Sequence, residues 1–270
     1  MILLRRIFDF YISSSIHVSV AVCALMGITL MEFNFPFSPI LLALMFFGSI
    51  TGYNFVKYAT VAKFRHRSLS PLLKQIQIFS ILCFVAMIGL LMYQSFDVLL
   101  LLGLLALITF FYAIPLLKNK NLRALQSIKI FLVAIVWAGV TVLTPIIDFF
   151  PEIEFDHWIS FIQRFLLVLV LTIPFEIRDL SYDPKRLGTF PQVLGIKTSK
   201  IFGIIFLSIN LIIEFFKDTI SFSYLSSLII ISVAACIFLL LTKERQSRYY
   251  ASFWVESIPI MWLLILFLLN

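Results

Sequence analysis

Long apolar runs alternate with short polar segments along the whole chain. Each run is apolar on all sides and covers roughly 17 to 21 residues, the length of an α-helix that crosses a hydrocarbon core of about 30 Å. A membrane β-barrel would need alternating polarity, which these runs lack. The pattern predicts an all-α polytopic membrane protein with about nine transmembrane helices, near residues 12–31, 37–56, 76–93, 97–116, 127–147, 159–178, 201–216, 224–242 and 252–269.

The basic residues fall almost entirely on one side of these predicted helices. With the N-terminus placed inside, 19 of the 21 Lys and Arg residues lie on the inner side, and only Arg164 and Lys217 lie outside. Cytoplasmic loops of membrane proteins carry such an excess of Lys and Arg. We therefore expect the N-terminus inside and the C-terminus outside.

Composition agrees with a membrane protein of one domain. The 270 residues are 61% hydrophobic and only 13% charged, which excludes a water-soluble globule. The longest polar connections, near 57–75 and 179–200, are too short for a soluble domain, so residues 1–270 are expected to form a single membrane domain. Arg5 and Arg6 precede an apolar run without a cleavage site, which indicates a first spanning helix.

The net charge of +7 does not indicate nucleic acid as a partner, because the basic residues follow the topology. The three cysteines and three histidines are scattered and match no metal-ligand spacing. The expected surroundings are membrane lipids, in an integral multi-pass protein of a bacterial inner membrane.

Three acidic residues at the end of the sixth predicted helix are the first sign of chemistry. Glu176, Asp179 and Asp183 are spaced i, i+3, i+7 and would line one helix face, while Arg178 points elsewhere. Stacked carboxylates repel one another unless a cation lies between them, and hard oxygen ligands suit Mg²⁺ shared with a phosphate. The alternative is a solvated helix end whose acids neutralise Arg178 and Lys185.

Two segments resemble the UbiA-type intramembrane prenyltransferase superfamily: FFYAIPLLKNKNLRALQSIKIFLVAIVWAG and EIRDLSYDPKRLGTFPQVLG. The second is similar to the family's second acidic motif, with Glu176, Asp179 and Asp183 at the acidic positions. The first matches an aromatic-x-x-Pro pattern with basic residues, through Tyr112 and Lys118. The resemblance implies nine helices, a cavity open to the cytoplasm, and Mg²⁺ held on the diphosphate of an isoprenoid donor.

The family's first acidic motif is missing at the end of the second predicted helix. Asn54 keeps the asparagine, but Phe55, Tyr58 and Ala62 occupy the three acidic positions. Loss of three carboxylates should remove one Mg²⁺ ion.

Cationic side chains near the lost motif could bind phosphate directly. Lys57, Arg65 and Arg67 are the candidates, and the alternative is that they enforce topology and contact anionic lipid. Lys129 and Glu256 lie inside predicted helices, where a charge is costly and faces either a cavity or an ion-pair partner.

Two functions of different classes follow from this combination. In the first, Glu176, Asp179 and Asp183 are catalytic and hold Mg²⁺, and the enzyme transfers an isoprenoid group from a prenyl diphosphate to an aromatic or other lipophilic acceptor. In the second, the chain is a catalytically silent lipid-binding or scaffold subunit with a protein partner. A transporter is a third alternative. For the enzyme, the candidate substrate-binding residues are Asn54, Lys57, Arg65, Arg67, Tyr112, Lys118, Lys129, Arg178 and Lys185.

Overall fold

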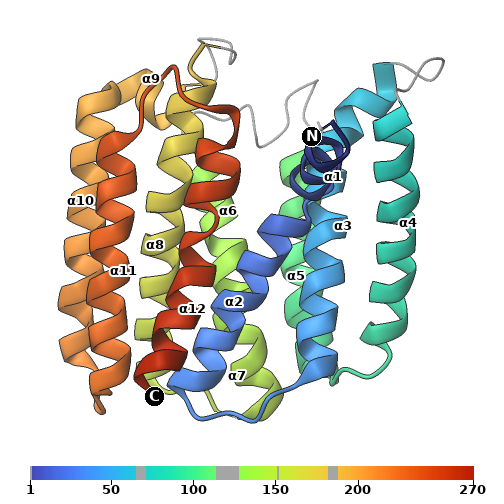
Figure 1. Cartoon of the computed structure of the whole chain (residues 1–270). Coiled ribbons are helices and arrows are strands. Elements are labelled where there is room, and N and C mark those ends of the chain that lie inside the picture. Colours follow the sequence, from blue (N-terminus) through green and yellow to red (C-terminus); the bar gives the residue numbers. More distant parts are fainter. Residues whose placement is uncertain (1, 65–70, 114–127, 151, 182–187) are drawn as a thin grey trace.

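The computed structural model is a bundle of helices with roughly parallel axes. The N- and C-termini of the chain lie at opposite ends of the bundle (Figure 1). The structure describes residues 2–64, 71–113, 128–150, 152–181 and 188–270, and side chains within these ranges except 2–3, 59–64 and 128. The helices of the described residues are α1 (Ile2–Ser13), α2 (Ile16–Glu32), α3 (Pro39–Phe64), α4 (Pro71–Leu91), α5 (Phe96–Ala113), α6 (Ile128–Ala138), α7 (Thr144–Phe149), α8 (Phe155–Asp179), α9 (Phe190–Leu194), α10 (Ile196–Ile213), α11 (Phe222–Leu241) and α12 (Ile258–Leu269).

Three short irregular helical segments complete the spans. The π-helical segment η2 (Gly139–Leu143) joins α6 to α7 within one span, and the π-helical segment η5 (Tyr250–Val255) precedes α12. The 3₁₀ turn η4 (Glu214–Phe216) extends α10.

The described residues contain eight helices or joined helices that are long and apolar enough to cross a membrane, and a bent ninth pair. The bent pair is α1 and α2, which meet at an angle of 56°. The expectation of an all-α bundle with about nine spans is therefore confirmed, and the chain is an integral multi-pass membrane protein. Which end faces the cytosol stays a prediction.

The first expected span was wrong as one continuous helix, whereas the second, near 37–56, agrees with the candidate span Pro39–Tyr58. The run 12–31 is interrupted at Ser15, whose left-handed backbone (φ 65°) ends α1 and starts α2. Serine side chains compete for backbone hydrogen bonds, so the run Ser13–Ser15 favours such a break. The helix of the second expected span, α3, continues to Phe64, so Lys57 lies on a helix and not in a polar connection.

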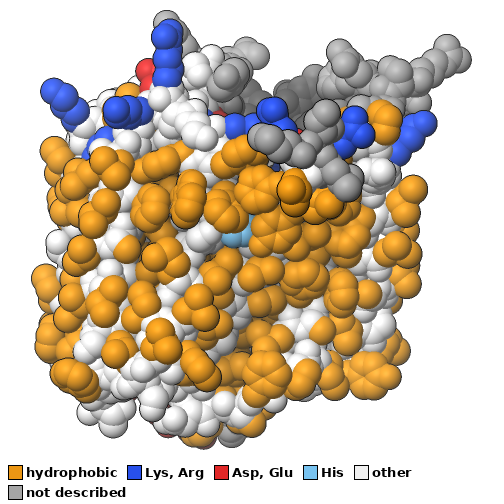
Figure 2. Space-filling view, viewed as in Figure 1, with side chains coloured by type: hydrophobic (Ala, Val, Ile, Leu, Met, Phe, Trp, Pro, Cys, Tyr) orange, Lys and Arg blue, Asp and Glu red, His pale blue; other side chains and the backbone are white. Residues whose placement is uncertain are grey.

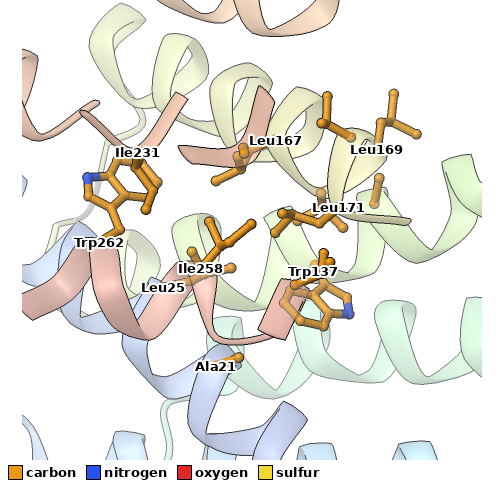
Figure 3. Close-up of a cluster of buried hydrophobic side chains, with 14 of the residues drawn as sticks. Ala21, Leu25, Trp137, Leu167, Leu169, Leu171, Ile231, Ile258 and Trp262 are labelled. Carbon is orange, nitrogen blue, oxygen red and sulfur yellow. The ribbon is translucent and has the colours of Figure 1, made fainter. Parts of the chain in front are cut away.

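Packing between helices closes a ring. In order of contact the ring runs α2, α3, α5, α6, α8, α10, α11, α12 and back to α2, and α4 packs mainly against α3. A buried apolar cluster fills the side of this ring formed by α2, α6, α8, α11 and α12. Figure 3 shows part of that cluster, including Leu25, Trp137, Leu167, Ile231 and Trp262.

The side chains that face outward are mostly apolar over the middle of the bundle. Figure 2 shows this band of hydrophobic side chains, with Lys and Arg gathered at the end where the N-terminus lies. We call this end, which carries Arg5, Lys57, Arg178, Lys200 and Arg248, the basic end. Such a belt is the surface expected against lipid acyl chains.

Candidate functional site

The end of α8 carries two of the three predicted acids to the basic end. Glu176 lies one turn before Asp179, where the helix ends. The glutamate is only 2% exposed, and its Oε1 lies 2.6 Å from Lys129 Nζ on α6. The prediction for Lys129 left open a cavity or a partner; the structure shows the ion pair between helices.

Asp179 is in a more open position and pairs with its neighbour. Arg178 Nε and Nη2 lie 2.8 and 3.2 Å from the two carboxylate oxygens of Asp179, and both side chains are over a quarter exposed. The guanidinium also lies 5.2 Å from the ring centre of Phe175. Because the pair is accessible, it contributes little to stability and can exchange partners.

Charged side chains from three distant parts of the sequence meet near this point. Glu256, between η5 and α12, interacts electrostatically with Lys57 on α3 and with Arg178 on α8. Lys57 belongs to a membrane-spanning helix, yet its side chain is accessible to solvent. Ionisable groups at membrane depth are costly and are candidates for a functional site.

Aromatic side chains with polar tips border the triad. Tyr53 lies beneath Lys57, whose Nζ is 5.8 Å from the tyrosine ring centre. Trp137 Nε1 donates a 2.7 Å hydrogen bond to the Tyr53 hydroxyl, and the buried Tyr112 interacts electrostatically with Tyr53. The predicted residue Tyr112 is thus brought towards the triad, from α5.

The positions of the lost acidic motif are used for packing within the protein. Asn54 is buried, and its amide bonds to Ser14 O, Ser15 Oγ and Ser80 Oγ at 2.7–3.0 Å. Phe55 stacks on Phe110 of α5 with the ring planes 6° apart. Tyr58 Oη donates to the carbonyl of Ser13 (2.9 Å).

Several predicted site residues lie outside the described residues. These are Asp183 and Lys185 after α8, Arg65 and Arg67 after α3, and Lys118 after α5. Within the part of the chain that the structure describes, no group of three or more His, Cys, Asp or Glu side chains could hold a metal ion. The predicted metal trio is therefore described only through Glu176 and Asp179.

A second polar cluster, at the opposite end of the bundle, was not predicted. Lys217 Nζ lies 2.6 Å from Glu32 Oε1 and 2.6 Å from Glu214 Oε2, and all three side chains are at most 6% exposed. Gln163 Nε2 donates to Glu214 Oε2 (2.9 Å). We call these residues, with Arg164, the outer cluster.

Arg164 lies inside the bundle and not in an outer connection. It is 1% exposed; its Nη1 donates to the carbonyl of Leu25 (3.0 Å), and its guanidinium lies 4.9 Å from the ring centre of Trp262. Its side of the membrane stays a prediction, and its burial among the helices was not expected, because one charge within an apolar run does not show which way the side chain points.

Solved structures with the same arrangement of helices identify the fold. A UbiA homologue from Archaeoglobus fulgidus bound to GPP and Mg²⁺ matches with a TM-score of 0.60 over 95% of this chain and 99% of that one, at 14% identity. The chain has the UbiA-type prenyltransferase fold. The homologue bound to DMAPP and Mg²⁺ matches similarly (TM-score 0.59, 14% identity, 97% and 98% covered).

A structure described as digeranylgeranylglyceryl phosphate synthase in membranes matches 98% of the chain and 97% of its own length (TM-score 0.58, 16% identity). No family model and no curated protein sequence matches the chain. At these identities the likeness establishes the UbiA fold, and the resemblance found in the two sequence segments is confirmed at that level.

Proposed function

We propose that this UbiA-fold protein is a membrane prenyltransferase that moves an isoprenoid group from a prenyl diphosphate to a lipophilic acceptor. The observation that carries the proposal is the triad of Lys57, Arg178 and Glu256 beside Asp179, in a fold whose solved members bind GPP and DMAPP. Two cations that both interact with Glu256, each accessible to solvent, suit the two phosphates of a prenyl diphosphate.

The donor would break at the bond between its allylic carbon and the diphosphate oxygen. Both electrons of that bond leave with the diphosphate, and the acceptor's nucleophilic atom forms the new bond to carbon and loses a proton. Lys57 and Arg178 would stabilise the charge that develops on the leaving group, the kind of interaction that lowers such barriers most. The aromatic rings of Tyr53, Tyr112 and Trp137 offer π faces to a cationic carbon.

The described residues fit a Mg²⁺ ion only in part. Asp179 has an accessible carboxylate, whereas the Glu176 carboxylate is held by Lys129 at 2.6 Å, so a metal would compete with that ammonium. We therefore propose Asp179 and Asp183 as the main ligands of one Mg²⁺, with Glu176 holding Lys129 near them. When bound, Mg²⁺ supplies charge neutralisation for the diphosphate.

An activity assay with matched variants tests the proposal. Purified protein in lipid nanodiscs should consume geranyl diphosphate in the presence of Mg²⁺ and a quinone-like or phenolic acceptor. Asp179→Asn and Asp183→Asn should each lower turnover at least tenfold, and Asp97→Asn, an acid in the first turn of α5, should not. Turnover unaffected by the first two substitutions would rule out the proposed metal site.

A silent lipid-binding or scaffold subunit is the second candidate. It is favoured by the ion pairs that already engage Glu176 and Asp179, and by the stacking of Phe55 where the family motif has an acid. It predicts a protein partner that co-purifies and no product from any prenyl diphosphate. An active protein without a partner would contradict it.

The proposed location is a bacterial inner membrane, with residues 1–270 as one domain and the basic end in the cytosol. The Lys and Arg side chains at that end support this orientation. Single cysteines at Leu4 and at Asn270, in a chain whose three cysteines are replaced, should react with an impermeant maleimide from opposite sides of the membrane. Equal labelling from one side would contradict the orientation.

A further inference from the structure

The bend between α1 and α2 is fastened by one face of α3. Tyr58 Oη donates to Ser13 O (2.9 Å), Asn54 Nδ2 to Ser14 O (3.0 Å), and Lys57 Nζ to Ser15 Oγ (2.9 Å). Three consecutive residues of the bend are thus bound by side chains spaced i, i+3, i+4, which share a helix face. Ser15 also donates to Asn54 Oδ1 (2.8 Å), at the residue with the left-handed backbone.

Earlier residues of α1 contact the segment that leads into α12. The Asp9 carboxylate accepts a hydrogen bond from the Tyr249 hydroxyl and lies 3.3 Å from Arg248 Nη1. The Phe8 ring packs edge-on against Tyr249 and Phe253, with ring centres 5.0 and 5.2 Å away. The short helix α1 therefore connects α3 with the segment that leads into α12, at the basic end (Figure 1).

Both supports of α1 adjoin the charged triad. Lys57 belongs to the α3 face and is also a member of the triad, while Glu256 follows Phe253 by less than one turn. The lysine ammonium is therefore shared between the Ser15 hydroxyl of the bend and the acidic and basic groups of the site. A multiply charged anion at the site would attract this ammonium more strongly than a neutral hydroxyl does.

We propose that α1 is a strap across the basic end and that an anionic diphosphate at the site loosens it by drawing Lys57 away from Ser15. The inference rests on the proposed function, because it assumes that the diphosphate of the donor binds beside Lys57. It gives the N-terminal helix a role in admitting substrate, and it gives Asn54 and Tyr58 a role in holding the strap closed.

Hydrogen–deuterium exchange of the backbone amides of residues 4–15, with and without saturating inorganic pyrophosphate, tests this coupling. Pyrophosphate should raise the exchange rate several-fold in the wild-type protein, and it should have no effect on these amides in Lys57→Met. Tyr58→Phe, which lacks the bond to Ser13, should raise exchange without any ligand. Tyr93→Phe, at the exposed turn after α4, is the matched control and should leave exchange unchanged.

The outcomes distinguish a failure of the strap hypothesis from a failure of the proposed anion site. Pyrophosphate that binds, as measured by calorimetry, but leaves exchange unchanged or lowers it would overturn the coupling alone. A full response in Lys57→Met would overturn the role of the lysine. If pyrophosphate does not bind, both the anion site and the coupling are overturned. If residues 4–15 exchange at the same rate in Tyr58→Phe as in Tyr93→Phe, the strap itself is overturned.

Discussion

The two ends of the bundle use the same charged side chains in opposite ways. In the outer cluster, Lys217 bridges Glu32 and Glu214, and all three are buried. At the basic end, Lys57 is accessible and has a hydroxyl and more distant charges as its neighbours. A buried and fully paired lysine holds helices together, whereas an accessible lysine that forms no ion pair with the described carboxylates remains available to a ligand.

The burial of the outer cluster explains its place in the fold. Its members come from the end of α2, the first half of α8 and the turn η4, so the cluster joins three elements that are distant in sequence. Removing one partner of a buried ion pair leaves an uncompensated buried charge. The free-energy cost of that charge is far larger than the net stabilisation that the intact pair provides.

Loss of the outer lysine should therefore have the largest effect on stability. Lys217→Met should lower the free energy of unfolding by about 3–5 kcal/mol, because Glu32 and Glu214 then face each other without a cation. Unfolding by SDS in mixed micelles measures this change. Pyrophosphate binding to the folded fraction of Lys217→Met should stay unchanged. Adding Glu32→Gln and Glu214→Gln to Lys217→Met should restore part of the lost stability. A loss of less than about 1 kcal/mol in Lys217→Met would remove the contrast between the two ends.

Loss of the inner lysine should have the converse effect. Lys57→Met should weaken pyrophosphate binding by roughly 10- to 100-fold, since a hydrogen bond to a charged group contributes about 1.5–3 kcal/mol. Stability should change by less than about 1 kcal/mol, because the side chain is accessible. Titration calorimetry and the same SDS unfolding measure both quantities, and a large loss of stability would show that Lys57 is a structural residue like Lys217.

Glu176 lies between these two cases and sharpens the comparison. It is buried like the outer acids, but its partner Lys129 is 22% exposed on the side chain and can turn towards water. Glu176→Gln should therefore cost about 1–2 kcal/mol of stability, less than Lys217→Met. Lys129→Met should lower the free energy of unfolding more than Glu176→Gln does, because it leaves the Glu176 carboxylate buried and unpaired. SDS unfolding of both variants measures this order, and the reverse order would show that Glu176 is not the buried member of the pair.

Ionic strength should give the smallest difference between the two ends. Raising NaCl from about 0.05 to 0.5 M screens accessible charges and should weaken pyrophosphate binding several-fold. The stability difference between wild type and Lys217→Met should hardly change, because salt does not reach the outer cluster. Equal salt sensitivity of both quantities would show that the outer cluster is open to solvent.

Sequence reasoning named several charged residues of the candidate site but not their contacts. The acids of α8 and the isolated charges Lys129 and Glu256 stood out, because each is rare inside an apolar run. The partner of each was not predictable, since Lys129 pairs with Glu176, and Glu256 interacts electrostatically with Lys57, only after distant helices pack together.

The strap shows a different limit. A run of three serines predicts a weak point in a helix, but the bend at Ser15 is fixed by Asn54, Lys57 and Tyr58, about forty residues away. The sequence alone indicates that Asn54 and Tyr58 occupy positions of an acidic motif and that Lys57 is a cationic neighbour. Their hydrogen bonds to the bend became apparent in three dimensions alone.

The sequence by itself determined that the chain is a helical membrane protein, because lipid requires apolar helices of a fixed length and places the basic loops on one side. It also determined where ionisable groups enter those helices. The tertiary structure decided which charges are paired and which remain accessible, because ion pairing depends on distances between helices that a pattern along one chain does not contain.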